Sequence, residues 1–387
     1  MLRFHIHQEK GQRMRCLRIA LIGLCCILHA PGTLYAEEGA DIGGALVYDY
    51  NPSTQLGDPL FGTLVADMQH DHPGRCSHGG PVCLQYANGV IAAFYANTSD
   101  HNSDGWTECA LSKDGGKTWA KYNKFQYSYD AYQKDPKEPA WVEEALVAGS
   151  GTAVLFLTHF KDDKRTRNAI LKSLDHGSTW TECEPFNADA VGYPCAVAVS
   201  GDTSYVLIDS NAGPHVLYAS MDDARTWRKR STLPLDKEKW YGAMCIMADG
   251  RLLAGAYTAE DEKHFHYCIS ADGGKTWSEQ KAAKVDKAIR DPELACVEGM
   301  YFLHGRSGHH APGAHRFVLY TSSNGEDWGE GIVVSGDERG PDGYSHNCIV
   351  RKGDSAAPAE LMVLYSIIYE GRDTNEYVFF IRPEPGN

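Results

Sequence analysis

An eight-residue stretch recurs along this chain of 387 residues and constrains its fold more than any other feature. The first copy reads Ser-Lys-Asp-Gly-Gly-Lys-Thr-Trp, and every copy keeps the serine, an aspartate or asparagine two positions later, and a closing tryptophan. The copies cover residues 112–119, 173–180, 220–227, 270–277 and 322–328, and their serines are 47 to 61 residues apart. A period of about 50 residues predicts one supersecondary unit used several times, as in a solenoid, a propeller or an array.

The residues of the repeat predict a tight turn between two strands. Its aspartate (Asn324 in the last copy) can accept backbone N–H groups, and the glycine beside it permits a positive φ. Its tryptophan offers a large apolar face that can pack under the following strand. Between the copies run short β-branched and aromatic segments bounded by Gly, Asp and Asn, almost without helical periodicity. This pattern is typical of an all-β chain.

The pattern Ser-x-Asp-x-Gly-x-Thr-Trp resembles the Asp box, or BNR repeat, and residues 43–383 resemble the Asp-box β-propellers of the sialidase superfamily. The resemblance implies four-stranded blades in which each box joins the third strand to the fourth. We predict a six-bladed β-propeller, with seven blades as the alternative if residues 51–75 add strands. Ala45–Tyr50 would complete the last blade, which removes exposed sheet edges. The link 120–140 would form a rim over the central cavity.

The first 36 residues predict a targeting segment. Arg13, Arg15 and Arg18 precede the apolar run 19–28, and residues 34–36 form a plausible cleavage site. The run is too short to span a bilayer as a helix. The predicted organisation is a signal peptide over 1–36 and a single sialidase-like propeller over 37–387, secreted or periplasmic and without a membrane span.

Charge and composition exclude several functions. The chain has 37 Lys and Arg against 51 Asp and Glu, a net charge of −14, which argues against nucleic acid as a partner. No phosphate-binding loop, dinucleotide fingerprint or EF-hand loop is present, so we expect no cofactor and assign no metal. His264, His266 and Cys268 share one strand face, and zinc binding there is an open alternative. The twelve cysteines do not determine a disulfide pattern.

The first group of candidate catalytic residues lies near the start of the first blade. We look there because ligands of propellers bind at the mouth of the central channel. His78 directly precedes the innermost strand, where the resemblance to sialidases implies an arginine at the position of Gly79. Propeller α-L-rhamnosidases and ulvan lyases, which this stretch also resembles, use a histidine as the main catalytic group. Asp100 and His101 lie in the next loop, and Asp100 stands where the resemblance implies the sialidase general acid.

A second group of candidates lies in the last two blades. The resemblance implies that Arg316 is the third carboxylate-binding arginine and that Tyr344 is the nucleophile. Arg306 and Arg316 could hold a sugar carboxylate through bidentate pairs. Glu293 is a catalytic candidate although it lies one blade after the position of the sialidase glutamate. Aromatic residues that could stack on a sugar are Tyr193, Trp240 and Tyr241.

These residues favour an exported, sialidase-like exo-glycosidase that acts on a terminal acidic sugar of a glycan or oligosaccharide, or on the neighbouring sugar. The missing first arginine, and the missing glutamate and arginine of the fourth blade, depart from the sialidase pattern. One alternative is a uronate-polysaccharide lyase or rhamnosidase-type enzyme that uses His78. Another is a non-catalytic glycan-binding propeller.

Overall fold

The computed structural model describes residues 63–67, 80–98, 104–120, 123–162, 164–183, 191–210, 214–236, 240–258, 261–306, 317–335, 342–351, 358–369 and 373–381. The chain divides into two compact units, 1–34 and 35–387, and every described residue lies in the second. Most of the described residues are in strands and one α-helix is present among them, so the all-β prediction is confirmed. Within these ranges no helix is long and apolar enough to cross a membrane.

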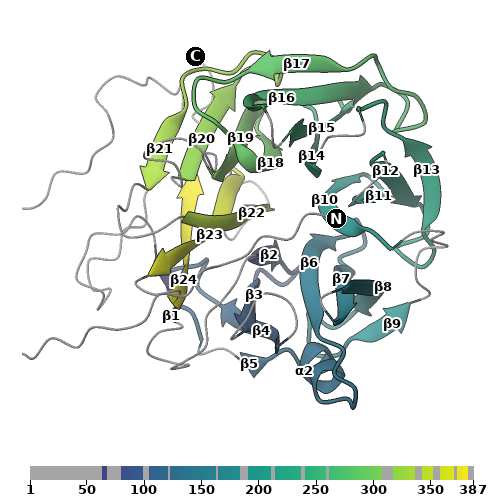
Figure 1. The fold of residues 1–387 in the computed structure, drawn as a ribbon, viewed down its shortest axis with the longest axis vertical. Coiled ribbons are helices and arrows are strands. Elements are labelled where there is room, and N and C mark those ends of the chain that lie inside the picture. The colour runs from purple at the N-terminus through teal and green to yellow at the C-terminus, as the bar shows by residue number, and fades with distance from the viewer. Residues whose placement is uncertain are drawn as a thin grey trace, which may run out of the picture. The chain divides into compact units, whose positions relative to one another are not determined.

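The described strands form six four-stranded antiparallel sheets, and the strands of each are consecutive in all but one (Figure 1). The first sheet consists of β2 (Val82–Gln85), β3 (Ile91–Thr98), β4 (Gly105–Ser112) and β5 (Asn123–Lys124). The second consists of β6 (Ala140–Val147), β7 (Ala153–Lys161), β8 (Lys164–Ser173) and β9 (Thr181–Cys183). The third consists of β10 (Tyr193–Ser200), β11 (Thr203–Asp209), β12 (Val216–Ser220) and β13 (Arg228–Thr232).

The remaining three sheets repeat this plan. The fourth consists of β14 (Trp240–Ile246), β15 (Leu252–Thr258), β16 (Asp261–Ser270) and β17 (Lys281–Lys284). The fifth consists of β18 (Arg290–Val297), β19 (Met300–Arg306), β20 (Phe317–Ser322) and β21 (Ile332–Ser335). The sixth consists of β22 (Asp342–Val350), β23 (Glu360–Tyr369), β24 (Asp373–Ile381) and β1 (Thr63–Asp67).

The strand that completes the sixth sheet differs from the predicted one. Thr63–Asp67 pairs antiparallel with β24, whereas we expected Ala45–Tyr50, which lies outside the described residues. The strand found within residues 51–75 therefore belongs to this sheet. Thr63–Asp67 is a short segment with two β-branched residues. A link of 14 residues separates it from β2, which is long enough for the chain to continue from the sixth sheet into the first.

The predicted rim over 120–140 also differs. This segment contains β5 and the short helix α2 (Gln126–Tyr132), which contacts β4 and β6. None of its described residues, 120 and 123–140, lines the pocket described below. Ser128 of the helix explains part of this placement, since its hydroxyl accepts the N–H of Thr107 on β4 and donates to the carbonyl of Ala140 on β6.

The repeated turns are closed by the hydrogen bonds that their residue types predict. In the first copy, the Asp114 carboxylate accepts the N–H of Lys117 and Thr118 and the Ser112 hydroxyl, while Ser112 accepts the N–H of Gly116. The same serine–aspartate bond, at 2.8–2.9 Å, recurs at Asp175, Asp222 and Asp272. Asn324 replaces the carboxylate in the fifth copy with its side-chain amide oxygen.

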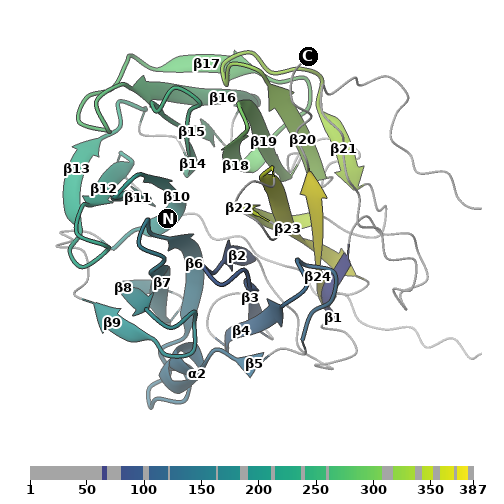
Figure 2. The ribbon, with the colours of Figure 1, turned by 180° about the vertical axis from the view of Figure 1, so that it is seen from behind.

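The hydrophobic core is divided among the spaces between successive sheets (Figure 2). One cluster joins Cys83, Ile91 and Tyr95 of the first sheet to buried residues of the sixth, such as Met362 and Phe380. The innermost strands contact one another in the same succession, namely β2, β6, β10, β14, β18, β22 and again β2. The second strands of the sheets are therefore buried on both faces, which is why β3, β7 and β15 read as nearly continuous apolar runs, whereas the fourth strands β9, β13 and β17 are polar and largely exposed.

Candidate active site

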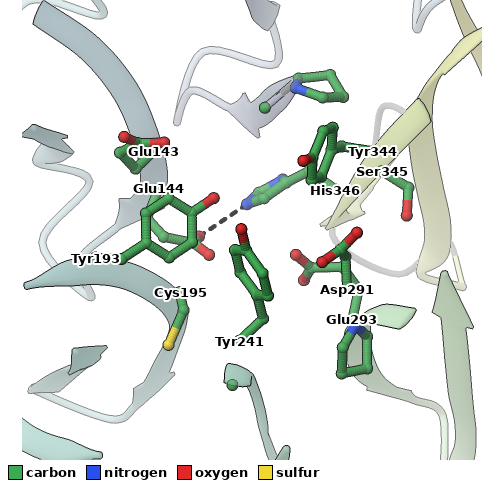
Figure 3. Close-up of a pocket in the computed structure, with 14 residues that line it drawn as sticks. Glu143, Glu144, Tyr193, Cys195, Tyr241, Asp291, Glu293, Tyr344, Ser345 and His346 are labelled. Atoms are coloured by element: carbon green, nitrogen blue, oxygen red, sulfur yellow. Dashed lines mark hydrogen bonds and ion pairs between the residues drawn. The ribbon is translucent and has the colours of Figure 1, made fainter. Parts of the chain in front are cut away.

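A pocket lies where the first halves of the innermost strands converge (Figure 3). The space between its lining residues is about 380 Å³, open solvent included. Five sheets and the two residues directly before β2 contribute to its lining. The lining residues are Gly80, Pro81, Glu143, Glu144, Tyr193, Cys195, Tyr241, Gly242, Asp291, Pro292, Glu293, Tyr344, Ser345 and His346.

Irregular pairing in the innermost strands brings several of these side chains into the pocket. Pairing with the second strand skips Glu143 on β6, Cys195 on β10 and Tyr241 on β14. It also shifts around Asp291 on β18 and Tyr344 on β22. An extra residue in one strand breaks the strict alternation of side chains and redirects them, as bulges next to active sites do. Consecutive residues such as Glu143 and Glu144 therefore line the same pocket.

Two of these bulged residues have unusual backbone conformations. Tyr241 has φ of 42° and Asp291 has φ of 49°, in the left-handed region that side chains other than glycine rarely adopt. Such conformations cost about 1–3 kcal/mol each and persist where the surrounding structure imposes them. They concentrate at functional sites, and both residues here point toward the pocket (Figure 3).

Two partly exposed carboxyl groups face the pocket from opposite sides, Glu143 from β6 and Glu293 from β18 (Figure 3). Burial raises the pKa of Glu143 to about 8, with Arg165 opposing the shift and Glu144 adding to it. Burial also raises the pKa of Glu293 well above its ordinary value, and the nearby charges of Glu144 and Asp291 raise it further. A pKa of about 8 leaves Glu143 mostly protonated at neutral pH, which a general acid requires.

Asp291 is a buried carboxylate held by cations. Its Oδ2 lies 2.5 Å from Nε of Arg306 and 3.8 Å from Nε of Arg290. Burial alone would lower the pKa of Arg306, but the interaction with Asp291 raises it overall. The Arg306 guanidinium also lies 4.5 Å from the ring centre of Tyr344. Arg306 thus fixes both Asp291 and Tyr344 at the pocket wall.

A second buried contact joins β6 to β22. Glu144 Oε2 lies 2.9 Å from Nε2 of His346, and both side chains are almost fully buried. Nδ1 of His346 accepts the backbone N–H of Cys83 on β2 at 3.2 Å. This contact ties the second, sixth and first sheets together beneath the pocket.

Tyrosines form the remaining wall. The rings of Tyr193 and Tyr241 meet edge to face with centres 5.3 Å apart, and Tyr241 is parallel to Tyr257 at 6.3 Å. Burial raises the pKa of Tyr193, Tyr241 and Tyr344, so these phenols remain neutral. Their partly exposed rings present apolar faces of the kind that stack on sugar rings.

The structure brings four of the predicted site residues together in the pocket, namely Tyr193, Tyr241, Glu293 and Tyr344. Arg306 lies behind this group and is paired with Asp291. Trp240 begins β14, but its side chain is not described. The other predicted residues, His78, Asp100, His101 and Arg316, lie outside the described residues and stay predictions.

Sequence reasoning missed four pocket residues that carry charge or can titrate, Glu143, Glu144, Asp291 and His346. A signal for the first two was present, because two adjacent glutamates interrupt the otherwise apolar run 140–148. Buried acids in such a run require partners. Nothing in the sequence shows that a bulge places both of them in one pocket.

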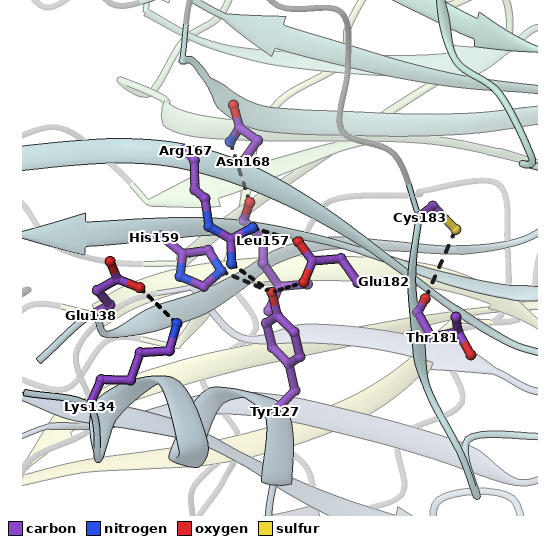
Figure 4. A network of polar contacts seen from close by, with 10 residues as sticks. All are labelled: Tyr127, Lys134, Glu138, Leu157, His159, Arg167, Asn168, Thr181, Glu182 and Cys183. Atoms are coloured by element: carbon purple, nitrogen blue, oxygen red, sulfur yellow. Dashed lines mark hydrogen bonds and ion pairs between the residues drawn. The ribbon is translucent and has the colours of Figure 1, made fainter.

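A separate polar network lies in the second sheet (Figure 4). Tyr127 of α2 donates to Glu182 on β9 at 2.9 Å and lies 3.1 Å from both His159 and Arg167. Arg167 also pairs with Glu182 at 2.5 Å. None of these residues lines the pocket, and their charges are matched within the network. We therefore assign this cluster to anchoring α2 on the sheet. Among the described residues, no group of three or more His, Cys, Asp or Glu has the arrangement of a metal site.

The sequence matches no family model and no curated protein. Solved structures are similar, among them a protein of unknown function from Dyadobacter fermentans (TM-score 0.65, 15% identity, 83% of this chain and 97% of that chain). Another is an α-L-arabinanase of Penicillium chrysogenum (TM-score 0.58, 14% identity, 83% of this chain and 98% of that chain). A third is a mutant of the NanB sialidase of Streptococcus pneumoniae (TM-score 0.58, 11% identity, 82% of this chain and 70% of that chain). Identities this low show the fold alone, and they support the propeller class that the repeats predict.

Proposed function

We propose that the protein is a glycoside hydrolase whose pocket cleaves the bond to an uncharged sugar. The observation that carries this proposal is a protonated carboxyl, Glu143, facing the buried carboxylate Asp291 across one pocket. Glycosidases use two carboxyl groups of this kind in different protonation states on either side of the scissile bond. The similarity in fold to an arabinanase and to sialidases supports a glycan as the substrate.

In this mechanism Glu143 donates its proton to the leaving-group oxygen as the glycosidic bond breaks. Asp291, fixed by Arg306, acts at the anomeric carbon as a nucleophile or as a base toward water. Glu293 remains protonated and donates a hydrogen bond to the sugar, while Tyr193 and Tyr241 hold the ring. The positive charge that develops on the sugar is stabilised by the surrounding carboxylates.

The charge of the pocket argues for an uncharged sugar. Its described lining carries four carboxyl groups and neither Lys nor Arg. Arg306 is already paired with Asp291, so it would have to give up that contact to bind a sugar carboxylate. An anionic sugar would therefore find no cation in the described lining to pair with, while an uncharged sugar needs none.

The test is hydrolysis of aryl glycosides of uncharged sugars, arabinofuranosides among them, by the purified protein. Glu143→Gln should lower kcat about 10²- to 10⁴-fold for a poor leaving group, and much less for dinitrophenyl leaving groups, which depart without a proton. Asp291→Asn should lower the rate for both. Glu182→Gln, in the same sheet as Glu143 but outside the pocket, is the matched control. Equal losses with both leaving groups in Glu143→Gln would contradict its role as the acid.

A second candidate is the sialidase-like enzyme of an acidic sugar, which the contact between Arg306 and Tyr344 favours. Here Tyr344 would be the nucleophile, and Arg306 and Arg316 would bind the sugar carboxylate. Release of free sialic acid from sialosides, abolished in Tyr344→Phe, would support it over an uncharged sugar. Absorbance near 235 nm on uronate glycans would instead indicate a lyase that uses His78, and binding without turnover would indicate a glycan-binding protein.

Two further proposals concern the whole chain. We propose that the six sheets form one six-bladed propeller, which the contact of β22 with β2 supports. We also propose that residues 1–36 are a signal peptide and that the mature protein is secreted or periplasmic. Mass spectrometry of the exported protein should then find an N-terminus at Glu37.

A further inference from the structure

A short chain of buried hydrogen bonds ends at Ser345, a pocket residue that no step described above uses. His304 on β19 lies between two side chains of β22. Its Nε2 is 3.0 Å from the amide nitrogen of Asn347, and its Nδ1 is 3.0 Å from the hydroxyl oxygen of Ser345. Asn347 and Ser345 are two positions apart on one strand, so they share a face. His304 is fully buried and packs on the ring of Phe317 at 5.5 Å.

Asn347 fixes the direction of these hydrogen bonds. An amide nitrogen can only donate, so Nε2 of His304 accepts and carries no proton. The imidazole is therefore the neutral tautomer with its proton on Nδ1. Burial lowers the pKa of His304 to about 3, which agrees with a neutral ring. The N–H at Nδ1 then donates to the hydroxyl oxygen of Ser345.

Ser345 is left with one proton to donate. A serine hydroxyl has one O–H and two acceptor lone pairs, and His304 occupies one of those lone pairs. Within the part of the chain that the structure describes, this O–H makes no hydrogen bond of its own. Ser345 lines the pocket next to Tyr344 and is buried (Figure 3). An acceptor atom of a molecule in the pocket would therefore complete its hydrogen bonding.

The same direction excludes Ser345 as a nucleophile activated by His304. A serine is activated when a neighbouring base takes its proton. Nδ1 of His304 already holds a proton, and the basic nitrogen Nε2 faces Asn347 instead. The three contacting residues thus look like a serine–histidine dyad with an orienting amide, but the protons point the other way. Ser345 can hold a ligand and cannot attack it.

We propose that Ser345 is a substrate-binding residue whose hydroxyl donates to an oxygen of an uncharged sugar, and that His304 and Asn347 are positioning residues that orient it. Sugars present hydroxyl and ring oxygens as acceptors, and the tyrosines of the pocket present rings for stacking. This inference deepens the proposed hydrolase function and rests on it for the class of ligand. A site built to hydrogen-bond a sugar oxygen rejects an analogue that lacks this oxygen.

The direction of the chain is tested first, by ¹⁵N NMR of the imidazoles in protein without ligand. The signals of His304 are assigned by their loss in His304→Gln or, if that variant does not fold, by magnetisation transfer from the ring of Phe317. We expect a proton on Nδ1 and none on Nε2. In Asn347→Asp, whose carboxylate can only accept, the proton should move to Nε2. A proton on Nε2 in the wild-type protein would overturn the proposal.

The role of Ser345 is tested with the aryl glycosides of uncharged sugars chosen for the proposed function. In Ser345→Ala we expect KM to rise about 2- to 10-fold with kcat nearly unchanged, as for one neutral hydrogen bond made equally in the ground and transition states. Asn347→Asp should raise KM similarly, because Ser345 would then donate to Nδ1. Ser204→Ala, which changes another buried serine on β11 outside the pocket, is the control. An unchanged KM in Ser345→Ala would overturn the proposal.

Binding measurements separate this inference from the proposed function. If no glycoside is hydrolysed, dissociation constants of the same glycosides, measured by calorimetry, replace KM. Weaker binding in Ser345→Ala without any hydrolysis would support the inference and remove the hydrolase. Hydrolysis with an unchanged KM in Ser345→Ala would support the hydrolase and remove the inference, and a lack of both binding and hydrolysis would overturn both. Covalent labelling of Ser345 by a fluorophosphonate would show His304 acting as a base and would also overturn the inference.

Discussion

Gly116 offers a test of the contact between the first and last sheets. It belongs to the turn after β4, with φ of 88°, and a Cβ added to it would lie 2.3 Å from Cζ of Phe380 on β24. Phe380 is 1% exposed and cannot move aside into solvent. Gly116→Ala therefore combines a strained backbone with a clash against a ring from the other end of the chain. Gly89→Ala is the matched control, because Gly89 has φ of 85° and nothing within 4 Å of the added Cβ.

Comparing the two variants separates the cost of backbone strain from the cost of overpacking. An alanine in the left-handed region costs about 1–2 kcal/mol at either position. Overpacking should add about 1–3 kcal/mol at Gly116 alone. We expect urea unfolding, followed by tryptophan fluorescence, to show a free energy of unfolding lower by that difference in Gly116→Ala than in Gly89→Ala. Adding Phe380→Leu should recover part of it. Equal destabilisation by the two glycine variants would refute the packing of the first turn on the last sheet.

Other expectations concern charge. Burial lowers the pKa of His304 to about 3, so the folded protein loses stability as the pH falls from 6.5 toward 3, where only the unfolded chain binds a proton at this residue. In His304→Gln, the midpoint of urea unfolding should therefore depend less on pH across that range. Hydrogen bonds from its own turn lower the pKa of Asp222 to about 2 although burial opposes them, so thermal scans of Asp222→Asn should lose less stability than wild type between pH 4 and 2. Arg306→Met removes the closer of the two cations that hold the buried Asp291 and leaves only Arg290 at 3.8 Å, so it should lower the free energy of unfolding by about 3–5 kcal/mol. Arg306→Met combined with Asp291→Asn should recover much of this loss.

Much of the fold could be predicted because its signals are local. The serine, aspartate or asparagine, and tryptophan of each turn act within eight residues, and the five turns mark the third and fourth strands of the first five sheets. The strand completing the sixth sheet could not be read in this way. Thr63–Asp67 pairs with a strand more than 300 residues later, and Ala45–Tyr50 has an equally suitable pattern. Choosing between them depends on the path of the chain between sheets, which no local pattern reports.

The candidate site was partly predictable for a related reason. The aromatic pattern of the channel indicates Tyr193 and Tyr241, and the resemblance to sialidases indicates Glu293 and Tyr344; all four lie on innermost strands and line the pocket. The sequence does not reveal the other pocket residues, Glu143, Glu144, Asp291 and His346. A charged residue inside an apolar strand indicates that the residue is buried, but it does not show which residue lies beside it in the fold. The contact of Glu144 with His346 joins residues 202 positions apart. Only the succession of the sheets brings them together.

The bulges explain why the pocket holds more polar groups than the strand pattern allows. A regular innermost strand alternates its side chains between two faces, and here each face packs against a neighbouring sheet. A polar side chain on either face would then be buried in a hydrophobic cluster. One skipped residue redirects the chain, so that Glu143, Tyr241 and Asp291 and the residue directly after each of them line the pocket, while the later residues of these strands follow the core pattern. The strands can therefore carry a polar site at one end and an apolar core over the rest of their length, and the positive φ of Tyr241 and Asp291 is the conformational cost of that change.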